Sequence, residues 1–162
     1  MQDRVIPFEN LSEFAGSASV AGKQVVLTNG CFDLLHAGHV DYLERARDLG
    51  DLLIVAINSD RSVRELKGPT RPINEEKNRA RVLSALRCVD YVTIFDSLRV
   101  TGVIERLRPA RYAKGGDYTL ETLDAGEREA MIACGTEICI LPLVPGQSTT
   151  NMIARASRPS DA

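Results

Sequence analysis

A strand, a glycine-bearing turn and a helix follow one another between residues 23 and 50. Residues 23–28 form a largely apolar, β-branched run, which is typical of a strand in the centre of a parallel sheet. Residues 40–49 place apolar side chains three or four positions apart, and Gly50 is a stop signal for the predicted helix. This order of elements favours an α/β fold.

Strand and helix patterns alternate along the rest of the chain. Apolar runs predict further strands at residues 51–58, 91–95, 112–113 and 137–141. Helical patterns occupy residues 74–85, 100–107 and 124–134, and a last helix begins at Ser148 or Thr149. We therefore expect a Rossmann-like three-layer α/β/α fold with a five-stranded parallel sheet and right-handed crossovers.

The domain boundaries follow from where these patterns begin and end. Residues 1–22 are expected to be an N-terminal extension, with a short helix through Phe14 and a loop over residues 16–22. The domain itself is placed at residues 23–156, and residues 157–162 are expected to be a flexible tail.

Composition excludes several classes of protein. With 162 residues, 44% hydrophobic and 26% charged, the chain has the composition of an ordinary single globular domain. Its formal net charge of −2 gives no sign of general nucleic-acid binding. No apolar run approaches the length of a membrane span and no signal segment is evident, so we expect a cytoplasmic protein without membrane attachment. The four cysteines show no metal-binding or redox spacing and are expected to be free thiols.

His36 and His39, the only two histidines of the chain, lie at the predicted start of a helix. Backbone N–H groups and the helix dipole make such a place suitable for an anion, and imidazoles add directional donors. Asp33 adds an oxygen that suits a divalent cation, whereas two histidines alone are too few ligands for zinc. This combination favours phosphate chemistry over a purely structural histidine pair, and Cys31 is expected to contribute its backbone N–H rather than its thiol.

Four polar segments follow predicted strands and should therefore meet at one edge of the sheet. They are the turn after residue 28, the segment 58–60, the segment 115–117 and the segment 146–150. Ligands of open parallel sheets bind at the carboxyl ends of the strands. The sequence thus predicts a single active site.

Four motifs in the same order resemble those of the HxGH nucleotidyltransferase, or cytidylyltransferase-like, superfamily. Residues 28–39 carry the HxGH signature itself, and residues 64–74, 114–118 and 148–153 match further motifs. Within the superfamily, these segments closely resemble the adenylyltransferases of ADP-heptose synthesis, which use D-glycero-β-D-manno-heptose 1-phosphate. The resemblance covers nearly the whole predicted domain and implies a nucleotidyltransferase-type fold.

The resemblance also implies roles for individual residues. The catalytic residues would be His36, His39, Lys67 and Arg79. Asp33, Asn58 and Lys67 would bind the sugar phosphate, and Asp33 would hold Mg²⁺ directly or through water. The nucleotide would contact Asn29, Gly30, Cys31, Phe32, His36, Gly38, His39, Gly115, Gly116, Asp117, Ser148, Thr149 and Thr150.

Residues 59–73 are expected to form a long loop that closes over the ligands. The segment contains one glycine and two prolines, and Asn74 is expected to cap the helix that follows. Lys67 would be delivered to the phosphates by this closure, while the role of Arg71 is left open.

The implied reaction joins ATP and the heptose 1-phosphate to give ADP-heptose and pyrophosphate, for lipopolysaccharide core or related surface glycans. A separate heptose kinase would be the pathway neighbour. The alternatives are a CTP-dependent polyol-phosphate cytidylyltransferase and a non-catalytic nucleotide-binding sensor. Residues 143–145 lack the arginine that cytidylyltransferases carry there, which argues against the first, and the intact set of site residues argues against the second.

A homodimer or larger homo-oligomer is also expected. The resemblance implies self-association, and two-fold dimers are the commonest soluble oligomers. The predicted helix at residues 74–85 and the residue after it add a hint, because they carry more apolar residues than one buried stripe needs: Ala80, Val82, Leu83, Ala85 and Leu86.

Overall fold

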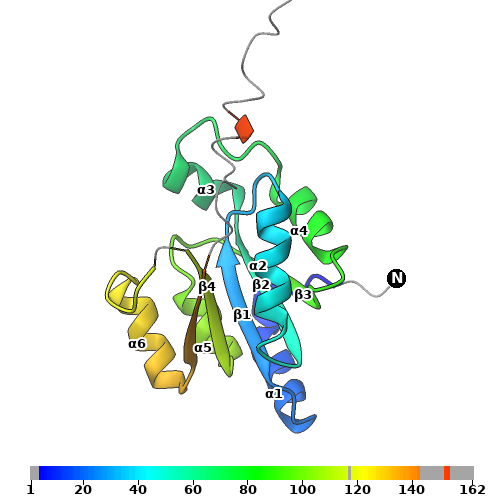
Figure 1. Ribbon diagram of the computed structural model, residues 1–162, viewed down its shortest axis with the longest axis vertical. Helices are drawn as coiled ribbons and strands as arrows, with labels where there is room; N and C mark the ends of the chain where they lie inside the picture. Colours follow the sequence, from blue (N-terminus) through cyan, green and yellow to red (C-terminus); the bar gives the residue numbers. More distant parts are fainter. Residues whose placement is uncertain (1–3, 117, 143–151, 154–162) are drawn as a thin grey trace, which may run out of the picture.

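The computed structural model describes residues 4–116, 118–142 and 152–153. Their five strands form one parallel sheet in the order β3-β2-β1-β4-β5 (Figure 1). The strands are β1 (Val25–Gly30), β2 (Leu52–Asn58), β3 (Tyr91–Phe95), β4 (Arg111–Gly115) and β5 (Glu137–Leu141). The predicted five-stranded parallel sheet is confirmed.

Helices cover both faces of this sheet (Figure 1). The helical elements are η1 (Phe8–Asn10), α1 (Leu11–Val20), α2 (Ala37–Arg47), α3 (Asp60–Lys67), α4 (Glu76–Ser84), α5 (Thr101–Leu107) and α6 (Ala125–Cys134). Buried side chains of α1, α5 and α6 share one apolar core with the sheet, and those of α2 and α4 share another. The three-layer arrangement is therefore also confirmed.

The central strand β2 shows why the chain folds around a parallel sheet. Its side chains alternate between the two cores, with Ile54 and Ala56 on one face and Leu53, Val55 and Ile57 on the other, and all five are fully buried. A strand that is covered on both faces needs a continuous apolar run, which is the pattern that the sequence carries here.

The strand order places a switch point between β1 and β4. The chain first moves outward from β1 through β2 to β3, and then returns across the sheet so that β4 pairs with the other side of β1. Ligands of doubly wound sheets bind at the carboxyl ends of the strands beside such a switch. The turn after β1 lies at this place (Figure 1).

The N-terminal segment is more ordered than its sequence indicates. Helix α1 continues through residues 16–20, where we expected a loop, because Leu11 and Ala18 are both buried against the sheet. Phe14 adds an edge-to-face contact with Tyr91, with ring centroids 4.9 Å apart. Burial of this face outweighs the low helix propensity of Gly16.

The expected long loop over residues 59–73 is partly a helix. Ser59 caps α3 by accepting a hydrogen bond from the Ser62 backbone N–H at 3.1 Å. Val63, on the inner face of the same helix, is fully buried. The cap of α4 is Glu75 rather than Asn74, whose side chain instead donates to the backbone oxygen of Asp33 at 2.9 Å.

Among the helices of the described ranges, none is long and apolar enough to cross a membrane.

Helix α4 uses most of its apolar residues inside the domain. Ala80 and Leu83 are buried against the sheet, and Leu86, just beyond the helix, packs against the same core. Val82 and Ala85 are the exposed members of the set that suggested self-association, and Val82 is 50% exposed. The helix alone therefore gives less support to a dimer than the sequence indicated.

The two ends of α1 allow a test of its place in the core. Leu11→Ala should lower the free energy of unfolding by about 2–5 kcal/mol, because it opens a cavity at a fully buried position. Val20→Ala, on the same helix but 92% exposed, should change it by less than about 0.5 kcal/mol. Denaturant titration of both variants measures the difference, and equally small effects would show that α1 is not part of the cooperative core.

Candidate active site

Helix α2 begins at the switch point and is fastened there by Tyr42. The Tyr42 hydroxyl lies 2.7 Å from Thr28 Oγ1 on β1 and donates to the Ala113 carbonyl on β4 at 2.9 Å. Burial raises the pKa of Tyr42 to about 12, so the hydroxyl stays protonated and keeps this donor. The first turn of α2 is thereby fixed above the carboxyl ends of β1 and β4.

His36 and His39 lie side by side in that first turn. His36 is the residue that caps α2, and the two ring centroids are 3.9 Å apart. The His36 backbone N–H donates to His39 Nδ1 at 3.4 Å, so in the neutral ring the proton is on Nε2. His39 therefore presents Nε2–H as a donor to whatever binds at the helix start.

Both imidazoles are held in the neutral form. Burial, together with the smaller effect of the neighbouring His36, lowers the pKa of His39 to about 4. Burial also lowers the pKa of His36. At neutral pH the pair therefore offers N–H donors and carries no positive charge.

The turn before α2 is shaped by Gly30 and Phe32. Phe32 has a positive φ of 47°, and its ring folds back over the end of β1. A Cβ on Gly30 would lie 3.0 Å from the Phe32 ring, which is closer than side-chain carbons normally approach. The ring also packs 5.4 Å from the His39 ring, between centroids, and so supports the histidine pair.

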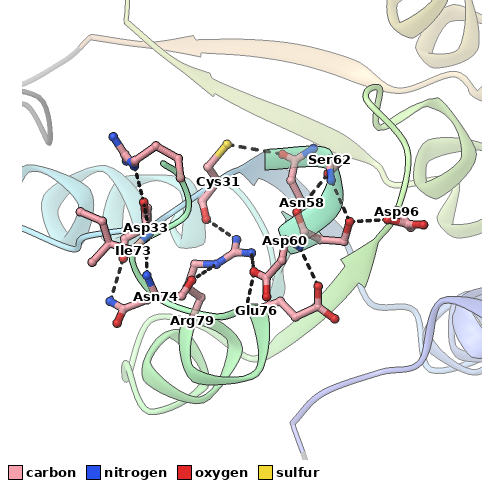
Figure 2. Close-up of polar contacts among 12 residues, drawn as sticks. Cys31, Asp33, Asn58, Asp60, Ser62, Ile73, Asn74, Glu76, Arg79 and Asp96 are labelled. Carbon is pink, nitrogen blue, oxygen red and sulfur yellow. Dashed lines mark hydrogen bonds and ion pairs between the residues drawn. The ribbon is translucent and has the colours of Figure 1, made fainter. Parts of the chain in front are cut away.

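Asp33 binds protein groups with both of its carboxylate oxygens (Figure 2). Arg71 Nε donates to it at 2.6 Å, and the backbone N–H groups of Ile73 and Asn74 donate at 2.9 and 2.8 Å. Burial alone would raise the pKa of Asp33, but the bonds from Asn74, Ile73 and Arg71 outweigh it and lower the pKa. Asp33 thus holds residues 71–74 against the turn as a permanent anion.

These contacts do not fit the predicted metal role of Asp33. A carboxylate that already accepts hydrogen bonds from three donor groups has little capacity left for a cation. Within residues 4–116, 118–142 and 152–153, no group of three or more histidine, cysteine, aspartate or glutamate side chains is arranged to hold a metal ion. The assignment of Arg71, which the sequence left open, is now clear: it is the ion-pair partner of Asp33.

Arg79 also has a different position from the predicted one. Its side chain is fully buried and donates to the backbone oxygens of Asn74 and Cys31, at 2.9 and 2.6 Å, and to Asp60 Oδ1 at 2.8 Å (Figure 2). With all three guanidinium nitrogens engaged, Arg79 does not face the open site. It joins the turn after β1, the start of α3 and the segment before α4. The sequence placed Asp60 at this edge, in the segment 58–60, but gave it no role.

Lys67 lies close enough to Cys31 for its charge to act on the thiol. Lys67 is exposed at the end of α3, and its positive charge acts on the Cys31 thiol. Burial is nevertheless the larger effect and raises the pKa of Cys31, so the thiol stays protonated and is not an activated nucleophile. The Cys31 Sγ lies 3.9 Å from Asn58 Oδ1, which brings the predicted sugar-binding Asn58 to the same edge (Figure 2).

The end of β4 brings the remaining described residues of the prediction to this edge. Gly115 closes the strand, and Gly116 follows with a positive φ of 91° and donates its N–H to Leu141. Asn29, on the neighbouring strand, accepts a hydrogen bond from Tyr112 at 2.5 Å. Gly38 lies in the first turn of α2. The predicted contacts Asp117, Ser148, Thr149 and Thr150 lie outside the described residues.

Comparison with known proteins agrees with this geometry. Residues 27–154 match the model of the family described as Cytidylyltransferase-like. The chain belongs to this family. A crystal structure of the lipopolysaccharide core biosynthesis protein from Thermoplasma volcanium GSS1 is similar in fold, with a TM-score of 0.62 and 27% identity over 76% of this chain and 98% of that one.

Curated relatives are similar over most of this chain. Two proteins named "Bifunctional protein HldE", from Syntrophotalea carbinolica and Geobacter sulfurreducens, are 52% and 48% identical over 134 and 150 residues. These alignments cover 83% and 91% of this chain but 27% and 30% of the relatives. The chain therefore spans less than a third of the length of the proteins that it matches.

The neutral histidines can be tested by NMR, because the chain holds only two. In the free protein, the His39 ring should titrate with a midpoint near pH 4, and its ¹⁵N shifts should show the Nε2–H tautomer. A His36→Gln variant assigns the two sets of signals. A His39 midpoint near 6.5 would contradict the burial argument.

Proposed function

We propose that this chain transfers an adenylyl group from ATP to D-glycero-β-D-manno-heptose 1-phosphate and releases pyrophosphate. The observation that carries the proposal is the neutral histidine pair at the start of α2, beside the β1–β4 switch point. Family membership supports nucleotidyl transfer. The motifs that resemble the adenylyltransferases of ADP-heptose synthesis support the choice of ATP and heptose.

This chain corresponds to one part of each bifunctional relative. They are named as bifunctional, and the region shared with this chain is less than a third of each. One of their two activities would then correspond to this chain. The other would be the kinase that supplies the sugar 1-phosphate.

The chemistry asks for positioning and charge stabilisation. A phosphate oxygen of the sugar 1-phosphate attacks the α-phosphorus of ATP, and the bond to the β,γ-pyrophosphate breaks as the new P–O bond forms. The attacking oxygen is already an anion, so the step needs no strong general base. His36 and His39 would donate to the α-phosphoryl and bridging oxygens, where negative charge increases in the transition state.

Three further charged residues of the site would have separate roles. Lys67, exposed at the end of α3, would approach the phosphates of the bound substrates. Arg79 and Asp33 would act through the protein, because the first fixes the Cys31 carbonyl and the second fixes residues 71–74. These two residues are positioning residues in this proposal.

Magnesium would enter as part of the MgATP substrate. The cation would neutralise charge on the triphosphate and so assist departure of pyrophosphate. We further propose a cytoplasmic enzyme that works as a homodimer or larger homo-oligomer.

A pyrophosphate-release assay tests the substrates. The protein should release pyrophosphate with ATP, Mg²⁺ and the heptose 1-phosphate, and removal of the cation with a chelator should stop the reaction. At equal sugar phosphate, ATP should give a higher kcat/KM than CTP. A clear preference for CTP or for a polyol phosphate would move the chain to the cytidylyltransferase alternative, and binding without any turnover would favour the sensor.

Substitution of the histidines separates catalysis from binding. His36→Ala and His39→Ala should each lower kcat by about two to three orders of magnitude, because each removes a donor to the transition state. The dissociation constant of ATP should change much less, and so should the melting temperature. Near-normal turnover in both variants would refute the role of the pair.

A further inference from the structure

Lys114 is a half-buried amine at the edge of the site that the mechanism above does not use. It lies next to the last residue of β4, and its Nζ is 3.4 Å from Asn29 Oδ1 and 4.7 Å from the centre of the Tyr118 ring. Within the described part of the chain, no carboxylate lies within 4.0 Å of this ammonium group. Among the described residues, the partners of the ammonium group are thus the neutral amide of Asn29 and the aromatic ring of Tyr118.

This environment leaves the ammonium group short of favourable partners. Burial lowers the pKa of Lys114, which means that the surroundings disfavour its charged form. The buried carboxylate of Glu127 offsets part of this effect from a distance, while Arg99 adds to it. An anion beside Nζ would supply the compensation that the protein itself gives only weakly.

Asn29 is oriented by the same contacts. Tyr112 Oη donates to Asn29 Oδ1 at 2.5 Å, and Lys114 donates to the same oxygen. Only the carbonyl end of the amide accepts hydrogen bonds, so the two donors fix which way the side chain lies. The other end, Nδ2, then carries two N–H donors on the residue next to Gly30, where the turn begins.

The strand pattern places Lys114 across the sheet edge from the histidines. Tyr112 belongs to the core shared with α5 and α6, whereas Ala113 belongs to the core shared with α2. Because side chains alternate along a strand, Lys114 is on the same face as Tyr112. A ligand over the ends of β1 and β4 would meet the start of α2 on one side and Lys114 on the other.

We propose that Lys114, with the Nδ2 of Asn29, binds a non-bridging phosphoryl oxygen of a bound substrate. The inference rests on the proposed function and adds a binding residue to it. An ammonium group is a compact donor with three N–H bonds, which suits a phosphate oxygen. The phosphoryl oxygen belongs either to ATP or to the sugar 1-phosphate, and the two sources can be separated by experiment.

The test compares Lys114→Met with Lys23→Met. Both remove one positive charge and keep a long side chain, but Lys23 is exposed just before the opposite end of β1. Calorimetry with ATP, AMP and adenosine measures the dissociation constants of the nucleotides, and steady-state kinetics measures the KM for heptose 1-phosphate. Lys114→Met should raise either the dissociation constants of ATP and AMP or the KM for the sugar phosphate about tenfold to a hundredfold, as loss of a charged hydrogen bond predicts.

The pattern of losses identifies the source of the oxygen. Weaker binding of ATP and AMP with unchanged binding of adenosine would assign it to the nucleotide. A higher KM for the sugar phosphate alone would assign it to the second substrate. Lys114→Arg, which keeps the charge, should recover part of the loss in either case, whereas Lys23→Met should match the wild type throughout.

Two results would overturn the inference. One is unchanged affinity and KM in Lys114→Met, and the other is equal weakening of adenosine, which would indicate a general structural effect. Neither result touches the proposed function, since the wild-type protein would still turn over. If the wild type released no pyrophosphate, the proposed function would fail, and calorimetry with ATP and AMP would still decide whether Lys114 binds a nucleotide phosphate.

Discussion

The buried guanidinium of Arg79 is the contact on which the geometry of the site depends. A charge without access to water must be fully paired, and loss of one partner of a buried ion pair commonly costs about 3–5 kcal/mol. Arg79 meets this requirement with Asp60 and with the carbonyls of Cys31 and Asn74, three groups from separate segments (Figure 2). The turn after β1 therefore cannot shift without moving α3 and the segment before α4.

A second set of contacts holds helix α3, which ends at Lys67, in place. The Asp60 backbone N–H donates to Glu76 Oε2 at 2.7 Å, and the Glu76 N–H donates to Asp60 Oδ1 at 2.8 Å, so the first turns of α3 and α4 cap each other. Asp33 anchors residues 71–74 beyond the far end of α3. Between these two anchors the chain leaves α3 at Gly68, whose positive φ of 102° is a conformation that glycine adopts without strain.

The sequence predicted the sheet because β2 and its neighbours carry their own signal, a continuous apolar run. It did not predict α3, where Val63 is the buried apolar residue and stability comes from the Ser59 cap and the contacts with α4. It placed Arg79 at the site but could not tell whether its partner is a ligand or the protein. That distinction depends on how the fold brings Asp60 and the carbonyls of Cys31 and Asn74 to the guanidinium, which leaves no pattern in the sequence.

The site separates neutral donors from positive charges. A helix start already carries partial positive charge, and an imidazolium ion there would be disfavoured by the dipole as well as by burial. Neutral N–H groups avoid that repulsion and still strengthen as charge develops on a phosphoryl oxygen. Two cations argued above to reach the substrates, Lys67 and Lys114, belong to α3 and β4. In the proposed reaction, these charges would hold the anionic substrates from the periphery while the histidines would donate at the phosphoryl group.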